Sequence, residues 1–107
     1  MDYRVTWSPD AYDDVESIAE YIARDSAFYA KAVVTKIIKQ SRALNKLPER
    51  GRIVPEIDDE NIREVFIYSY RLIYRIQEQD KVVLVAAIVH GSRLLDPLMT
   101  RFTETPG

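Results

Sequence analysis

Residues 70–93 read YRLIYRIQEQDKVVLVAAIVHGSR, and this stretch decides the fold. Polar and apolar side chains alternate over residues 70–76, which is the pattern of a strand with one buried face. Residues 82–89 are apolar without interruption, which predicts a strand in the middle of a sheet, covered on both faces. This strand ends at His90, the only histidine of the chain, and Arg93 follows three residues later. Chargeable side chains at the end of a rigid strand predict a functional surface at this place.

A strand over residues 62–68 is expected to form a hairpin with the first of these strands through a turn at Ser69 and Tyr70. Pairing Ile67 with Leu72 sorts the side chains best, because a slip by one residue would exchange the two faces. One face is then apolar and faces the core, with Val65, Ile67, Leu72, Tyr74 and Ile76. The other is a mixed surface, with Glu64, Phe66, Tyr68, Arg71, Ile73 and Arg75.

The first half of the chain predicts a strand over residues 3–7 and two helices. Ser8 is a suitable cap for a helix that runs to about Arg24, since its side chain can accept a backbone N–H. A break at Asp25-Ser26, which also caps the next helix, separates it from a longer helix over residues 27–47 that Pro48 ends. A two-residue break between two amphipathic helices predicts an antiparallel hairpin. The expected order is β-α-α-β-β-β, an α+β fold with the helical hairpin packed on a small, mainly antiparallel sheet.

The net charge of −2 conceals an uneven distribution. Residues 1–30 carry seven acids and two bases, a net charge of −5, while residues 31–56 carry seven bases and two acids, +5. On the second helix the bases share one side, because successive residues turn by about 100°. This basic row is either a surface for a partner or target or simply a solvated helix face. It consists of Lys31, Lys39, Arg42 and Lys46.

The composition predicts an ordinary soluble domain spanning residues 1–107, with residues 103–107 frayed. Cysteine is absent and histidine occurs once, so neither a transition-metal site nor another cofactor is expected. The N-terminal sequence lacks a signal-peptide pattern, and no apolar run approaches the roughly 20 residues of a membrane span. A cytoplasmic location without membrane contact is therefore expected.

Three residues are candidates for chemistry on the sheet: Arg71, His90 and Arg93. Glu64 opposite Arg75 explains that arginine as one member of an ion pair, whereas Arg71 has no assigned partner. His90 could serve as an acid, a base or a hydrogen-bond donor, although a strand-end histidine is more often only packed. Tyr70, at the turn, is the tyrosine most expected to be exposed.

Several short motifs, taken in order, resemble the RelE/ParE toxin superfamily over nearly the whole chain. The motifs are Trp7-Ser8-Pro9, Leu47-Pro48 with Gly51-Arg52, Arg63-Glu64-Val65, Tyr70-Arg71-Leu72-Ile73-Tyr74 and Val89-His90-Gly91-Ser92-Arg93. The resemblance implies a small toxin that a cognate antitoxin binds and silences, in a toxin–antitoxin hetero-oligomer.

The resemblance also implies one of two activities. RelE-like members cleave mRNA on the ribosome, and of their basic residues Arg71 and Arg93 remain here. Their two lysines fall on Ile62 and Glu64, and their tyrosine falls near Met99. ParE-like members inhibit DNA gyrase without chemistry of their own, and the strand end at 88–90 with residues 98–101 resembles them more closely. The ParE-like branch is favoured, and a non-toxic binding module of the same fold is a third alternative.

Overall fold

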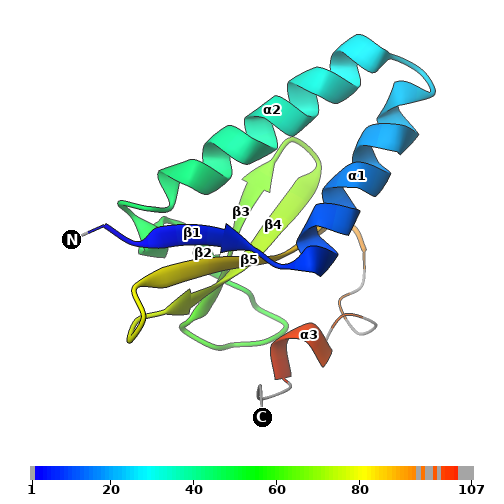
Figure 1. The fold of residues 1–107 in the computed structure, drawn as a ribbon. Helices are drawn as coiled ribbons and strands as arrows, with labels where there is room; N and C mark the ends of the chain where they lie inside the picture. Colours follow the sequence, from blue (N-terminus) through cyan, green and yellow to red (C-terminus); the bar gives the residue numbers. More distant parts are fainter. Residues whose placement is uncertain (1, 94, 96–97, 99, 104–107) are drawn as a thin grey trace.

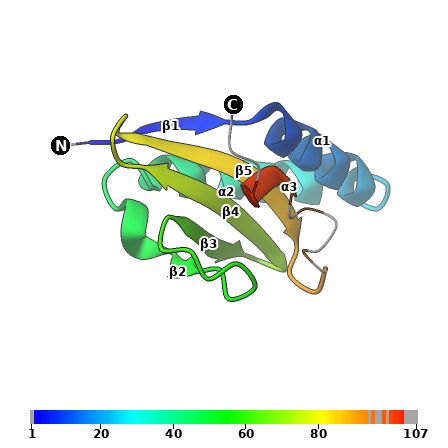
Figure 2. The same cartoon turned by 90° about the horizontal axis from the view of Figure 1, so that it is seen from below.

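The computed structural model describes residues 2–93, 95, 98 and 100–103. Two long helices lie across one face of a five-stranded sheet, and a short C-terminal helix lies on the other side (Figures 1 and 2). No helix in the described part of the chain is long and apolar enough to span a membrane. The elements are β1 (Arg4–Trp7), α1 (Pro9–Ala23), α2 (Ala27–Ala43), a 3₁₀ turn (Pro48–Arg50), β2 (Arg52–Ile53), β3 (Ile62–Ile67), β4 (Tyr70–Gln77), β5 (Val82–His90) and α3 (Thr100–Thr103).

The strand order of the sheet is β1-β5-β4-β3-β2. β5 runs parallel to β1 and antiparallel to β4, and the remaining neighbours are antiparallel. The predicted α+β fold, a helical hairpin on a mainly antiparallel sheet, is thus confirmed. β5 is an interior strand as expected, but the middle position belongs to β4, because the two-residue strand β2, which was not predicted, extends the sheet beyond β3.

A β-bulge lets the apolar run of β5 serve both faces of the sheet. Ile73 lies opposite Ala87 but Tyr74 lies opposite Val85, so Ala86 is an extra residue. Before the bulge Val85 packs into the core under the helices, and the bulge shifts the alternation by one residue. The two apolar clusters on the two faces of the sheet share the side chains of β5 between them: Val83, Val85 and Ile88 on the helix side, and Ala86, Ala87 and Val89 on the other.

The predicted hairpin register was wrong by two residues. The turn is Tyr68-Ser69, and Ile67 pairs with Tyr70 instead of Leu72. Tyr68 has φ = 54°, and the favoured two-residue hairpin turns share a positive φ at this first position of the turn. A shift of two keeps the alternation, so the predicted core face is confirmed.

The opposite face of the hairpin is not the open surface expected. Ile73 is completely buried there, beneath a second apolar cluster to which the C-terminal segment contributes Leu95, Leu98 and Phe102. Burial of each such large apolar side chain contributes about 1.5–3 kcal/mol. The periodicity of β4 alone could not reveal this cover, because the covering residues lie some 20 or more positions further along the chain.

Serine caps position both long helices as predicted. The Ser8 and Ser26 hydroxyls accept N–H groups in the first turns of α1 and α2, at 3.1 and 3.0 Å. α2 ends at Ala43 rather than near residue 47, and the completely buried Leu44 follows as its C-cap residue. The two helices therefore form the antiparallel hairpin visible in Figure 1, with their apolar sides on the sheet.

Candidate functional site

Arg71 lies in a buried ion network on the face of the sheet away from α1 and α2. Its Nη1 and Nη2 donate to the two carboxylate oxygens of Glu56 at 2.8 and 2.9 Å, and its Nε donates to Glu64 Oε1 at 2.6 Å. The second oxygen of Glu64 accepts from Arg52 Nε at 2.6 Å. The Arg71 side chain is 4% exposed and that of Glu64 is 0% exposed. Two guanidinium and two carboxylate groups thus neutralise one another in this network.

Each of the three guanidinium nitrogens of Arg71 donates to a carboxylate, and the side chain is almost fully buried. Its hydrogen bonds to Glu56, and further those to Glu64, raise the pKa of Arg71 against the effect of its burial. The prediction that Arg71 lacks a partner was therefore wrong. So was the pairing of Glu64 with Arg75, because Arg75 instead donates to the backbone carbonyl of Phe102.

Glu56 closes the network from the loop between β2 and β3. Its hydrogen bonds from Arg71 lower the pKa of Glu56, despite some burial that opposes the shift. The stabilisation is present above the unfolded pKa of a glutamate, about 4.3, and is lost as the pH falls through the lower folded value. Glu56 remains accessible, since 43% of its side chain is exposed.

Glu56→Gln is expected to reduce the free energy of unfolding at pH 7 by on the order of 1 kcal/mol, because the pair is partly screened by solvent. Urea unfolding should show a smaller difference from the unmodified chain at pH 3 than at pH 7, because the lowered pKa of Glu56 means that the ion pair is lost progressively as the pH falls. Glu60→Gln changes an exposed glutamate of the same loop and is the matched control. An equal difference at both pH values would rule out the ionised pair as its source.

His90 lies exposed at the end of β5, beside Tyr70. The two rings meet edge to face, with centroids 5.7 Å apart. His90 Nδ1 lies 2.8 Å from Ser92 Oγ and accepts the Ser92 backbone N–H at 3.2 Å. Local contacts thus occupy one ring nitrogen, as expected for a packed strand-end histidine.

Tyr70 is half-buried rather than the most exposed tyrosine. Burial raises the pKa of Tyr70, with smaller contributions from Tyr21 and Tyr29. Arg93 is exposed close by, and its backbone N–H donates to the His90 carbonyl at 3.0 Å. The fold therefore brings His90, Tyr70 and Arg93 to one end of the sheet, whereas Arg71 belongs to the ion network.

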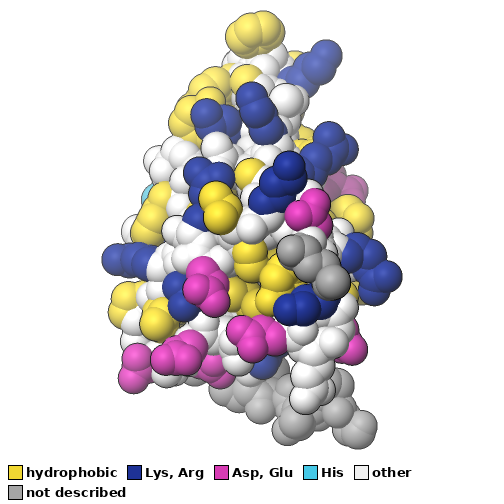
Figure 3. Space-filling model, turned by 90° about the vertical axis from the view of Figure 1, so that its left-hand side faces the viewer, with side chains coloured by type: hydrophobic (Ala, Val, Ile, Leu, Met, Phe, Trp, Pro, Cys, Tyr) yellow, Lys and Arg dark blue, Asp and Glu magenta, His cyan; other side chains and the backbone are white. Residues whose placement is uncertain are grey.

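The basic row is exposed along its length, as the sequence predicted: Lys31, Lys39 and Arg42 lie on α2, and Lys46 lies in the turn that follows it. Figure 3 shows lysine and arginine side chains gathered over the upper part of this side of the molecule and most acidic side chains over its lower part. A groove of about 510 Å³ lies between α2 and the turn that joins β3 to β4. It is lined by Phe28, Lys31, Ala32, Thr35, Lys36, Lys39 and Tyr68.

Sequence reasoning missed the aromatic side chains around this groove. Phe28 is 86% exposed, and Tyr29 and Tyr68 lie with ring centroids 6.3 Å apart. The sequence held one signal: Phe28 lies on the side of α2 opposite its buried stripe. Exposed aromatic residues beside lysines form a surface suited to binding a partner.

Glu56 was also missed as a partner of Arg71, and Arg52 as a partner of Glu64. Both come from the connector before β3, whose path no periodic pattern fixes. The Arg52 guanidinium lies 5.1 Å from the centre of the Phe66 ring and covers one side of that exposed side chain. The signal that the sequence held was a glutamate and an arginine, Glu64 and Arg71, predicted on the same face of neighbouring strands.

Solved structures from ParDE and RelBE toxin–antitoxin systems have a fold similar to this arrangement of two helices on one face of a sheet. A chain of the chromosomal ParDE system from P. aeruginosa superimposes with a TM-score of 0.67 at 18% identity, over 82% of this chain and 95% of that one. A chain of the toxin–antitoxin complex RelBE2 from Mycobacterium tuberculosis gives 0.62 at 18% identity, over 84% and 99%. A mutant of the E. coli toxin RelE in the free state gives 0.65 at 15% identity, over 94% of each chain.

The sequence defines the family more closely. The sequence model of a protein family, described as the ParE toxin of the type II toxin–antitoxin system parDE, matches residues 5–95. The chain belongs to this family of toxins. No curated protein matches the sequence.

Proposed function

We propose that this chain is a growth-inhibiting toxin that acts by binding DNA gyrase in the cytoplasm, and that a cognate antitoxin neutralises it. Membership in the ParE family supports this proposal. The observation that carries the choice of target is the state of Arg71. Cleavage of RNA requires cationic donors aimed at the developing charge of the phosphate, whereas the Arg71 guanidinium is buried and bound to two carboxylates.

The exposed residues near the sheet end suit binding better than catalysis. Tyr70, His90 and Arg93 offer an aromatic edge, a ring nitrogen and a cation. Binding surfaces distribute their energy over several side chains. The proposal therefore assigns this end of the sheet to target contact and no chemical step to the toxin.

Induced expression, followed by separate assays of DNA supercoiling and of cleavage of ribosome-bound mRNA, tests the target. Loss of supercoiling with intact mRNA is the expected result. Arg93→Ala should weaken growth inhibition only in part and His90→Gln should change it little, provided that circular dichroism shows both variants folded.

The ribosome-dependent alternative makes opposite demands. It requires mRNA cleavage and a loss of about 10²–10³ in rate when one transition-state donor is removed, here Arg93. Unchanged growth after induction of the folded chain would instead favour the non-toxic binding module.

The basic row of α2 and the groove beside it are proposed as contacts for the antitoxin. Affinity would come from apolar burial around Phe28 and Tyr68, and orientation from the lysines. The similar solved structures include ParDE and RelBE toxin–antitoxin assemblies, which supports a partner of this kind.

Reversing Lys39, Arg42 and Lys46 to glutamate is expected to slow antitoxin association roughly tenfold or more, because long-range attraction is lost. Stopped-flow measurements at several salt concentrations should show the effect shrinking as salt rises. Reversal of Arg4, Arg24 and Arg50, which are exposed elsewhere, changes the net charge equally and is the control. Equal rates for both triple variants would place the antitoxin contact away from α2.

A further inference from the structure

The two helices of the hairpin carry charges of opposite sign. α1 contains five acidic residues and no base, whereas α2 contains four bases and no acid. On α1 the exposed acids that point away from the sheet are Asp13, Glu16 and Glu20, and on α2 the exposed bases are Lys31, Lys36, Lys39 and Arg42. Both charge excesses were evident in the sequence, and the fold brings them onto neighbouring helices as an acidic row and a basic row.

These seven charges have no ion-pair partner in the part of the chain that the structure describes. The acids of α1 that do form salt bridges are Asp10 and Asp14, and both pair with Arg101. The remaining salt bridges belong to the Arg71 network. The hairpin thus presents an acidic row and a basic row side by side, each unsatisfied.

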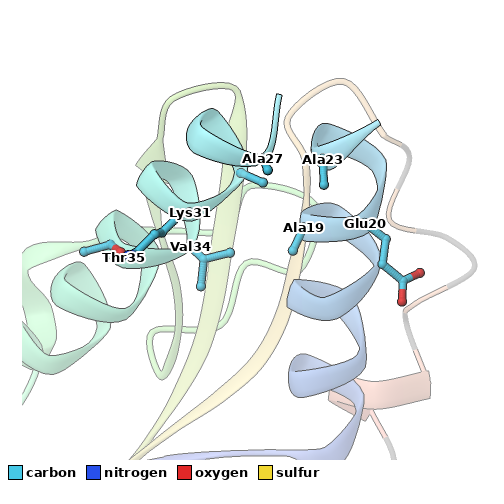
Figure 4. Close-up of a pocket in the computed structure, with 8 residues that line it drawn as sticks. Ala19, Glu20, Ala23, Ala27, Lys31, Val34 and Thr35 are labelled. Atoms are coloured by element: carbon cyan, nitrogen blue, oxygen red, sulfur yellow. The ribbon is translucent and has the colours of Figure 1, made fainter. Parts of the chain in front are cut away.

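An apolar groove of about 410 Å³ separates the two rows. Figure 4 shows Ala19 and Ala23 on α1 and Ala27 on α2 along it, with the Glu20 carboxylate pointing away from α2. The most exposed large apolar side chain, Phe28, stands next to this groove at the start of α2. An apolar seam between two charged rows resembles the core and rim of an interface.

We propose that the helical hairpin is a self-association surface, on which a second copy of this chain packs face to face about a two-fold axis. The charges select the direction of that axis. An axis parallel to the helices sets α1 of each copy over α2 of the other, so each acidic row meets a basic row. An axis across the helices would set α1 on α1 and α2 on α2, and like charges would oppose one another.

The antiparallel hairpin fixes which residues meet. Glu20 and Lys31 both line the groove, and Figure 4 shows them at a similar height on the two helices. In the selected arrangement Glu20 of one copy faces Lys31 of the other, and the reverse pair forms by symmetry. Phe28 of each copy lies over the alanines of the other, where its exposed ring gains the burial that the monomer does not provide.

The size of the face predicts a reversible dimer. Helices of 15 and 17 residues are about 22 and 25 Å long, and two helices side by side are about 20 Å wide. Two such faces bury about 1,000 Å², at the lower limit for a specific interface. Association should therefore depend on protein concentration and should weaken with salt.

The test uses two charge variants of the full chain, Glu20→Lys and Lys31→Glu, in sedimentation equilibrium over a range of concentrations. Each variant alone places like charges together twice and is expected to dimerise at least tenfold more weakly than the unmodified chain. An equimolar mixture of the two is expected to recover dimers, because the lysine introduced at position 20 of one variant then meets the glutamate introduced at position 31 of the other. The unchanged residues at these two positions form the second pair. Phe28→Ala should also lose dimers, whereas Glu78→Lys, an exposed change in the β4–β5 turn, should not.

A monomeric unmodified chain at high concentration and low salt would overturn the proposal. Variants that remain monomeric when mixed would do the same, because they deny that Glu20 and Lys31 meet across the interface. The binding of the antitoxin, measured at a concentration at which this chain is monomeric, tests the proposed function independently of dimer formation. If the antitoxin alone uses the hairpin face, the charge variants alter that association while the unmodified chain stays monomeric.

Discussion

Replacing Arg71 by leucine is expected to lower the free energy of unfolding by about 3–5 kcal/mol, the usual effect of removing one partner from a buried ion pair. The Glu64 carboxylate is completely buried and would keep only Arg52, whose side chain is 58% exposed. Urea denaturation followed by circular dichroism measures the change. Arg93→Leu, at an exposed arginine, should leave stability nearly unchanged.

The double variant Arg71→Leu/Glu64→Leu identifies the cause. If an unpaired buried carboxylate is responsible, removal of both charges should recover most of the lost stability, because apolar replacements of a whole buried pair are often neutral. A double variant as unstable as Arg71→Leu would point to lost packing or to Glu56 instead. This experiment also shows why loss of toxicity in an Arg71 variant cannot by itself assign that residue to the target surface.

Gly51→Ala is expected to cost about 2–3 kcal/mol, because a side chain at this position has no space. An added Cβ would lie 2.5 Å from Tyr74 Oη and 2.6 Å from the backbone oxygen of Glu64. The Gly51 N–H also donates to Tyr74 Oη at 3.0 Å, and that hydroxyl donates to the Pro48 carbonyl at 2.6 Å. Burial raises the pKa of Tyr74 and keeps its hydroxyl a donor at neutral pH.

Thermal unfolding of Gly51→Ala, Tyr74→Phe and the double variant distinguishes the loss of the hydrogen bond to Tyr74 Oη from the steric clash of the added Cβ. Phenylalanine removes only one of the two obstructing atoms, so the double variant should remain less stable than Tyr74→Phe alone. Equal stability of these two variants would mean that the chain shifts freely at residue 51. Gly91→Ala is a milder comparison, since its nearest contact is 3.2 Å, to the Ser69 carbonyl oxygen.

Local patterns predicted the elements that depend on local physics. Ser8 and Ser26 capped the helices as expected, and alternation sorted the hairpin faces even though the register was two residues wrong. The turn length was not readable, since Tyr68 adopts a positive φ at a position where Gly or Asn is the usual signal. The bulge at Ala86 could not be predicted either, because in an unbroken apolar run a change of the side-chain alternation leaves no mark in the sequence.

The candidate site was less predictable because its partners come from irregular segments. Arg71 was identified as a candidate site residue, but its place in the ion network depends on Glu56, which comes from an irregular loop. The basic row was predictable from helical spacing alone, since it needs no knowledge of other elements. The expected fraying at residues 103–107 and the position of Met99 lie largely outside the described residues.

The parallel pairing of β1 with β5 has a consequence for synthesis. The Ser8 hydroxyl donates to the Ala86 carbonyl, 78 positions later in the chain. At 5–20 residues per second, a ribosome needs about 4–16 s to add that many residues. β1 is therefore synthesised several seconds before the strand with which it pairs. The residues of the helical hairpin are also synthesised in that time, and their apolar side has no sheet to pack on until β4 and β5 emerge.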